Sequence, residues 1–214
     1  MDLTVDVAMA MMRVTALRMG DAADELSRLD AVAGDGDHGV NMASAFADAS
    51  ERLVVAAPVS VADVFIVVSR AFNEGAGGSA GALFGAYFAA IGQRLNVPGT
   101  PTLADFAEGL EAGARRVAEL GRCALGDKTM LDALQPAADA ARSTLEAGGE
   151  LAAVLVASSV AADQGAKSTA GMVAKLGRAR YSSSGAVGTG DPGASSVAVM
   201  FGAWEEAMGK ETRT

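Results

Sequence analysis

Apolar residues recur three and four positions apart through almost all of this sequence, which is the spacing of one face of an α-helix. Alanine is frequent and runs of β-branched residues are short, and both features favour helix over strand. The chain is therefore predicted to be all-α. We expect eight helices, at about 3 to 28, 39 to 54, 60 to 74, 79 to 95, 102 to 121, 129 to 147, 150 to 175 and 193 to 209.

Amphipathic helices of similar length joined by short loops lie antiparallel to their neighbours and share one core. The sequence thus predicts an eight-helix antiparallel, up-and-down array, and the periodicity leaves a bundle and a closed barrel both open. With 214 residues and no shift of composition, positions 1–214 are predicted to form a single domain. Ser60 with Asp63, and Thr102 with Asp105, have the spacing of helix N-terminal caps.

Charge and composition exclude several classes of protein. The net charge is −9, from 17 basic and 26 acidic residues, and the basic residues are scattered, so nucleic acid is not an expected partner. No apolar run reaches the roughly 18 residues that a membrane span needs. The first ten residues, MDLTVDVAMA, lack the basic start of an export signal. A single cysteine, Cys123, excludes an internal disulfide framework and is interpreted as a packing residue, so a cytoplasmic location is expected.

An acidic cluster interrupts the helical pattern in the stretch LDAVAGDGDHGVNMASAF. Asp30, Asp35 and Asp37 lie among three glycines directly before an apolar helix pattern, and their mutual repulsion is costly unless a cation neutralises it. The stretch is not an EF-hand, because Phe46 occupies the position of the bidentate glutamate. Carboxylates in this arrangement suit Mg²⁺, which completes its coordination with phosphate oxygens and water. A magnesium–nucleotide site is the natural interpretation.

A glycine-rich segment, NEGAGGSAGALFG, precedes another predicted helix. Its glycines would let the backbone approach a ligand, and the N-terminus of the following helix would attract a phosphate. The segment follows a helical pattern and lacks the lysine of a P-loop, so the P-loop and dinucleotide-binding fingerprints both fail. Close helix packing through small residues explains the glycines equally well.

Two further irregular segments are GRCALGDKTMLDALQP and GRARYSSSGAVGTGDPGASS. In the first, Gly126 and Asp127 predict a turn and a cap for the next helix. In the second, Arg178 is either an anion clamp or a surface charge, and Asp191 begins the turn into the last helix. The second segment is predicted to be a long structureless loop. Loops of that length are usually functional or disordered. All four segments meet only if alternate loops collect at one end of the array.

His38 is the single histidine of the chain. It follows Asp37 at a helix start, where it is either a donor to a phosphate, a stacking surface for a base, or a satisfied polar side chain. No second histidine is present for a relay, and no G-x-S-x-G motif is present. Hydrolysis by a Ser–His–Asp triad is therefore excluded.

Five motifs in order over nearly the whole chain, GDGDHGVNM, GGSAGALFG, GDKTMLDAL, AKSTAGMVAKLGRARY and DPGASS, resemble the nucleotide-binding subunit of dihydroxyacetone kinase, the DhaL family. The resemblance implies a barrel of eight antiparallel helices that holds ADP or ATP and two Mg²⁺ ions at one rim. It implies metal ligation by Asp30, Asp35 and Asp37. The implied nucleotide contacts are His38, Val40, Asn41, Gly78, Ser79, Gly121, Met130, Arg178, Asp191 and Gly193, and Leu83 is expected to pack on the adenine together with Met130.

The chain departs from the family pattern at one position. Many members have a serine where this chain has Ala80, and the hydroxyl here lies one position earlier, at Ser79. A side-chain hydrogen bond to phosphate is thereby lost or moved, whereas backbone N–H groups remain.

The resemblance also implies a phosphotransferase of the glycerone kinase type that is active only with a partner. In the family a histidine on a separate subunit or domain holds the ketose; here a DhaK-like subunit is the expected partner, and the catalytic base is expected on it. Phosphoryl donation by ATP and a phosphotransferase-system relay, in which a phosphocarrier protein rephosphorylates a permanently bound ADP, both remain open. A kinase subunit for a four-carbon ketose or for fatty acids, and a non-catalytic nucleotide-binding module, are the other hypotheses. A homodimer is also expected.

Overall fold

The helices form where the apolar period predicts them. The computed structural model describes residues 2–75, 77–182 and 185–211, and these contain eight α-helices and no strand. The α-helices are α1 (Val5–Asp30), α2 (His38–Ala56), α3 (Val61–Gly75), α4 (Gly78–Leu95), α5 (Leu103–Gly121), α6 (Leu131–Glu146), α7 (Leu151–Ser168) and α8 (Pro192–Glu211). Two short 3₁₀ helices, η1 (Thr169–Gly171) and η2 (Arg178–Tyr181), lie between α7 and α8. The all-α prediction is confirmed.

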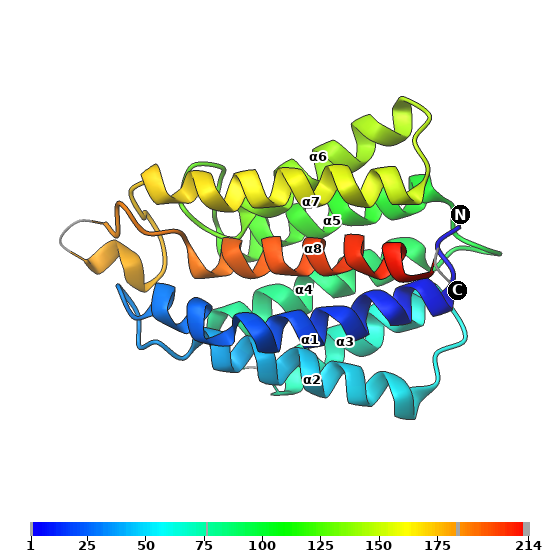
Figure 1. The fold of residues 1–214 in the computed structure, drawn as a ribbon, viewed down its shortest axis with the longest axis horizontal. Helices are drawn as coiled ribbons and strands as arrows, with labels where there is room; N and C mark the ends of the chain where they lie inside the picture. The colour runs from blue at the N-terminus through cyan, green and yellow to red at the C-terminus, as the bar shows by residue number, and fades with distance from the viewer. Residues whose placement is uncertain (1, 76, 183–184, 212–214) are drawn as a thin grey trace.

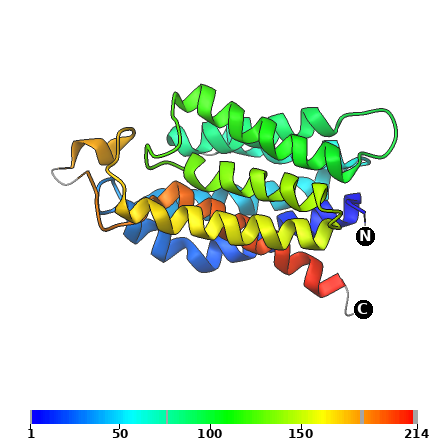
Figure 2. The same cartoon turned by 90° about the horizontal axis from the view of Figure 1, so that it is seen from above.

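The helices run up and down side by side along the long axis of the molecule (Figures 1 and 2). Each helix packs against the helix before and after it in the chain, and α8 packs against α1. The contact between α8 and α1 closes the ring, so the array is a barrel rather than an open bundle. None of the helices in the described residues combines the length and the apolar composition needed to cross a membrane.

Aromatic side chains fill the interior of the ring. Phe46 of α2 contacts Phe72 of α3 edge to face, with the ring centroids 4.9 Å apart, and Phe201 and Trp204 of α8 are equally close. Phe65 of α3 contacts Trp204 across the interior. Because these rings come from helices on different sides and are almost fully buried, their packing ties the ring together.

The connections alternate between the two ends of the barrel (Figure 1). Those between α1 and α2, α3 and α4, α5 and α6, and α7 and α8 lie at one end, here called the site end. The other three connections, the start of α1 and the end of α8 lie at the opposite end, here called the far end. Both predicted caps are confirmed at the far end: Asp63 N–H donates to Ser60 Oγ at 3.1 Å, and Thr102 and Asp105 form a reciprocal capping box.

Two details of the prediction are wrong at the site end. The helix predicted to reach residue 175 ends at Ser168, because the chain turns through η1 and is extended at Met172. Asp127 does not cap α6. Asp132, inside the first turn of α6, accepts hydrogen bonds from the N–H groups of Gly126 and Thr129, at 2.6 and 2.8 Å.

The last irregular segment is more ordered than predicted, because η2 forms within it and α8 begins at Pro192. Residues 183–184 of that segment lie outside the described residues, as does Ala76 of the glycine-rich segment.

Candidate functional site

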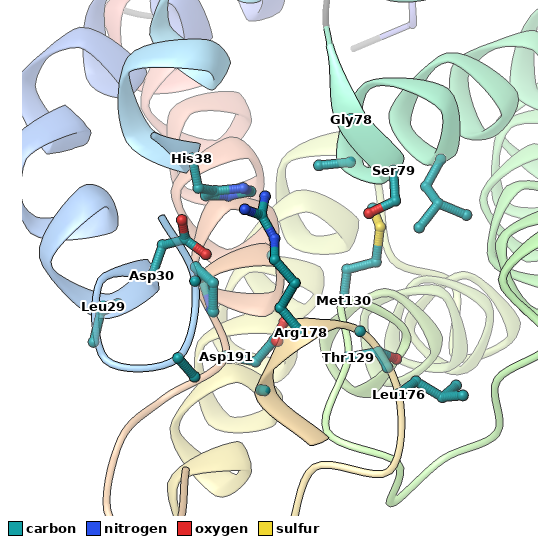
Figure 3. Close-up of a pocket in the computed structure, with 18 of the residues that line it drawn as sticks. Leu29, Asp30, His38, Gly78, Ser79, Thr129, Met130, Leu176, Arg178 and Asp191 are labelled. Atoms are coloured by element: carbon teal, nitrogen blue, oxygen red, sulfur yellow. The ribbon is translucent and has the colours of Figure 1, made fainter. Parts of the chain in front are cut away.

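A cavity of about 370 Å³ opens at the site end, within the size range of small-molecule sites (Figure 3). All four irregular segments line it, so alternate loops do collect at one end of the barrel. Of the predicted site residues, those that line it are Asp30, Asp37, His38, Asn41, Gly78, Ser79, Leu83, Gly121, Met130, Arg178, Asp191 and Gly193. Asp35 and Val40 do not line it. Val40 is 62% exposed and lies outside the lining of the cavity.

The acidic cluster lies where α1 ends and α2 begins. Asp30 is the last residue of α1, and its Oδ2 accepts a hydrogen bond from the N–H of Gly36 at 2.9 Å. A Cβ on Gly34 would lie 2.4 Å from Asp30 Oδ1, so glycine is required for the loop to fold over this carboxylate. One carboxylate oxygen each from Asp30, Asp35 and Asp37 lies within 4.8 Å of the others. Three hard oxygen donors at this spacing fit a magnesium ion.

Arg178 of η2 extends into the cavity toward this acidic cluster (Figure 3). Its guanidinium forms an ion pair with the Asp35 carboxylate and lies 3.9 Å from that of Asp37. The hydrogen bond from Arg178 lowers the pKa of Asp35, and the same bond raises the pKa of Arg178. The cavity therefore brings a fixed positive charge next to the proposed metal ligands.

The N-terminus of α4 forms the opposite wall. Gly77 is extended and Gly78 has a φ of +74°, a left-handed conformation that favours glycine. Among the residues that the structure describes, no side chain caps the helix, and Gly78, Ser79 and Ala80 of its first turn line the cavity. Uncapped N–H groups and the positive end of the helix dipole suit a phosphate. The hydroxyl missing at Ala80 is supplied next to it by Ser79.

Apolar side chains line the part of the cavity between α4, α5 and α6. They are Leu83, Val117, Cys123 and Met130, with Gly121 among them. A Cβ on Gly121 would lie 3.5 Å from Leu83, so this wall is closely packed. Burial raises the pKa of the Cys123 thiol, which keeps it neutral as the packing interpretation expects. The cavity is thus charged near α1 and α2 and apolar near α5 and α6, a polarity that matches a nucleotide.

His38 is buried at the start of α2, and its ring is bonded to α8. Its Nε2 lies 2.8 Å from Ser196 Oγ of α8. Burial lowers the pKa of His38, which keeps the ring neutral. This contact favours the interpretation of His38 as a satisfied polar side chain that borders the cavity.

Asp191 closes the cavity at the start of α8. Its carboxylate accepts a hydrogen bond from Ala194 N–H at 2.8 Å, and its own N–H donates to Thr169 Oγ1 at 2.8 Å. Burial raises the pKa of Asp191 to about 6. The side chain thus caps α8 and presents a carboxyl group whose ionisation is disfavoured.

Sequence reasoning missed several residues that shape the site. Lys128 is buried beside the cavity and donates to backbone carbonyls, Thr169 holds Asp191, and Ser196 holds His38. All three lie in motifs that resemble a known family. No local pattern identifies their partners, because those partners are 22 to 158 residues away.

Comparison with known proteins places this chain in a family. The family model described as the DAK2 domain matches residues 32–206. The chain belongs to the DAK2 domain family. The ADP-binding subunit DhaL of the PEP-dependent dihydroxyacetone kinase of Escherichia coli is 33% identical over 176 residues, which cover 82% of this chain and 84% of that subunit. The predicted DhaL-like character of the chain is thereby confirmed.

Other relatives in the DAK2 family are longer. A D-erythrulose kinase of Mycolicibacterium smegmatis is 36% identical over 183 residues, which are 85% of this chain and 32% of that kinase. The crystal structure of the dihydroxyacetone kinase of C. freundii in complex with AMP-PNP and Mg²⁺ superposes with a TM-score of 0.73 at 28% identity, covering 96% of this chain and 34% of that one. This chain therefore spans about a third of the length of these two proteins.

Proposed function

We propose that this chain is the nucleotide- and magnesium-binding subunit of a dihydroxyacetone-type kinase. It would deliver a phosphoryl group from bound ATP to a short ketose held by a separate DhaK-like subunit. The main support is the cavity, in which an acidic cluster, an uncapped helix N-terminus and an apolar wall meet. The similarity to a kinase structure solved with AMP-PNP and Mg²⁺ supports the same proposal.

The carboxylates of Asp30, Asp35 and Asp37 are the proposed magnesium ligands. Bound Mg²⁺ would neutralise phosphate charge and align the transferred group, which is the main need of phosphoryl transfer. The N–H groups of Gly78 and Ser79 are proposed to hold phosphate oxygens, because both residues line the cavity at the start of α4.

Arg178 is the proposed anion clamp, since its guanidinium lies between the acidic cluster and the α4 wall (Figure 3). Leu83 and Met130 are the proposed adenine contacts because they form the apolar wall. The remaining predicted contacts, His38, Val40, Asn41, Gly121, Asp191 and Gly193, are proposed to shape the site around the nucleotide.

The catalytic base is proposed to lie on the partner. His38 is the only histidine of the sequence, and its Nε2 already lies within hydrogen-bonding distance of Ser196 Oγ. Burial lowers the pKa of this imidazole and Ser196 occupies its Nε2, so it is a poor acceptor for the proton of a ketose hydroxyl. The chain's own residues then act by positioning and electrostatics, which dominate phosphoryl transfer.

One experiment tests the identity of both the phosphoryl donor and the ketose. The purified chain is mixed with its DhaK-like partner and supplied either with ATP or with a phosphorylated carrier protein, and with either dihydroxyacetone or erythrulose. Turnover on ATP alone is the expected result. Turnover only with the carrier would favour the relay, which the match to most of a PEP-dependent subunit makes the second candidate.

Erythrulose is included because three of the similar proteins are named as erythrulose kinases. Preferential phosphorylation of erythrulose would identify a four-carbon ketose as the substrate. Tight ADP binding without phosphoryl transfer to any ketose on the partner would contradict the kinase proposal and favour a regulatory module.

A further inference from the structure

Lys128 is a charged side chain in the interior of the site end. It lies in the connection between α5 and α6, and only 4% of its surface is exposed. Its Nζ lies 2.7 Å from the carbonyl oxygen of Thr169, 3.3 Å from that of Met172, 2.9 Å from that of Ala186 and 2.6 Å from that of Thr189. No carboxylate lies within ion-pairing distance of this ammonium in the described residues. Its partners are neutral backbone groups.

These carbonyls belong to two short segments at the base of one long loop. Thr169 and Met172 lie where α7 ends and the loop begins, and Ala186 and Thr189 lie where the loop returns toward α8. Two backbone hydrogen bonds join the same segments, from Gly188 N–H to Ala170 and from Ala174 N–H to Gly185, at 2.8 and 3.0 Å. The Lys128 ammonium therefore links the two ends of the loop to each other and to the α5–α6 connection.

The loop that Lys128 closes contributes much of the cavity wall. It includes Arg178, which extends from η2 to the acidic cluster, and it leads into Asp191. Without a link at its base, a loop of this length has a large conformational entropy that must be lost when a ligand binds. The position of Arg178 thus depends on how firmly the base of the loop is held.

The environment of Lys128 favours a cation. The carbonyls of Thr169 and Met172 follow the C-terminus of α7, where the helix dipole is negative. Burial lowers the pKa of Lys128, and the Asp191 carboxylate opposes that change through space. Lys128 also has a φ of +61°, which costs energy for a residue with a side chain and persists only where the surroundings hold it. An ammonium offers three N–H donors, so the contacts occupy all of them.

We propose that Lys128 is a positioning residue whose ammonium clamps the loop from Thr169 to Thr189 and thereby places Arg178 and Asp191 in the nucleotide cavity. It acts through the loop, because its donors are bonded to backbone carbonyls. The proposal rests on the proposed nucleotide-binding function for its effect on binding, whereas its effect on the loop is measured without any nucleotide.

The first test compares Lys128→Met with Lys175→Met. Lys175 is a matched control because it lies in the same loop, is 62% exposed and bonds to the side chain of Asp127 rather than to the carbonyl cage. In the ligand-free proteins, hydrogen exchange of the amides from 172 to 190 is expected to speed up in Lys128→Met and to stay unchanged in Lys175→Met. The Kd for magnesium–ADP, measured by calorimetry, is expected to rise about tenfold or more in Lys128→Met only, because hydrogen bonds to a charged donor are lost.

The second test is rescue of Lys128→Ala by small cations. This variant removes the ammonium and leaves the carbonyl oxygens, so ammonium or potassium chloride is expected to slow the exchange of the same amides and to lower the Kd. Tetramethylammonium chloride at equal ionic strength is the control, since it cannot donate hydrogen bonds and is too large for the cage. No rescue by either small cation would contradict a cation clamp.

Other outcomes also separate the two proposals. Wild-type exchange rates in Lys128→Met, or faster exchange spread evenly over all the helices, would overturn the clamp. If the wild-type chain binds no magnesium–ADP but Lys128→Met still loosens residues 172 to 190, the nucleotide proposal fails and the clamp stands.

Discussion

The two ends of the barrel satisfy their polar groups in different ways. At the far end the partners are local: Thr102 and Asp105 cap α5 between them, and Gly149 N–H donates to the Thr144 carbonyl where α6 ends. At the site end, Asp132 and Asp191 also make local contacts, but further polar groups have partners distant in sequence. Lys128 bonds to Thr169, 41 residues away, and His38 bonds to Ser196, 158 residues away.

We therefore expect the far end to affect mainly stability and the site end to affect mainly binding. A local cap stabilises one helix, so its loss is expected to weaken the fold a little and leave the cavity unchanged. A long-range contact at the site end forms only after the ring has closed, and it positions groups around the cavity. Substitutions there are therefore expected to change binding more than stability. Four substitutions test this contrast, in order of expected effect.

Asp37→Asn should have the largest effect, and only on binding. It replaces one of the clustered carboxylates by a neutral amide, and the Kd for magnesium–ADP is expected to rise by more than about 100-fold, since even the outer-shell partners of metal ligands contribute about 10- to 100-fold. Calorimetry measures the Kd, and circular dichroism should show unchanged helicity. Asp63→Asn at the far end is the control and should bind as wild type does.

Asp191→Asn should make stability less dependent on pH. The Asp191 pKa is raised from 3.8 to about 6, so the folded state holds this proton more tightly than the unfolded state, and the fold is destabilised as the pH rises through that range. Asparagine keeps an oxygen for the Ala194 N–H and never ionises. The free energy of unfolding of the variant relative to wild type should increase by about 1 kcal/mol between pH 5 and pH 7.

Urea titrations at the two pH values measure this difference. A difference that does not change with pH would show that the Asp191 carboxyl is not the group responsible. Lys128 and Asp132 are the charged groups whose fields act on Asp191, so salt should alter the size of the difference without reversing it.

Thr102→Ala should act only on stability. The hydroxyl accepts the hydrogen bond of Asp105 N–H at 3.2 Å, and loss of such a cap costs about 1 kcal/mol of unfolding free energy. Urea denaturation measures the cost, and the Kd for magnesium–ADP should remain that of wild type. A weaker Kd in this variant would show that the two ends are coupled.

Arg178→Gln should have the smallest effect of the four substitutions. It should increase the affinity for Mg²⁺ in the absence of nucleotide. The guanidinium pairs with Asp35, a proposed magnesium ligand, so Mg²⁺ without nucleotide competes with it. The pair is exposed, and exposed pairs contribute at most about 1 kcal/mol, so the affinity for Mg²⁺ alone should increase by up to about fivefold. The affinity for magnesium–ADP should decrease in the same variant. A decrease in both affinities would contradict the competition.

The sequence predicted the local features of the fold well. The helices, the two far-end caps and the distribution of segments around the site all follow from apolar spacing, cap residues and the alternation of loops. The same reasoning extended α7 to residue 175, because the helical period continues through Met172 and Val173 although the chain has already turned at Thr169.

The contacts that hold the site were not predictable in the same way. Lys128 looks like any surface charge in its own segment, and only the closed ring brings the carbonyls of Thr169 and Thr189 to it. Asp127 has the position of a cap, but Asp132 reaches both N–H groups from inside the helix. The Lys128 contacts depend on tertiary structure, whereas the Asp132 contacts are local and show that a side chain inside the first turn can take the place of the expected cap.

The most direct test of the account is the position of the metal. Crystals of the chain grown with ADP and Mn²⁺, a metal that resembles Mg²⁺ in its preference for oxygen ligands and scatters anomalously, would locate it without assumption. We expect an anomalous peak between Asp30, Asp35 and Asp37, with the phosphates of ADP between that peak and the N-terminus of α4. A peak elsewhere, or ADP bound with these three carboxylates free of metal, would contradict the central claim.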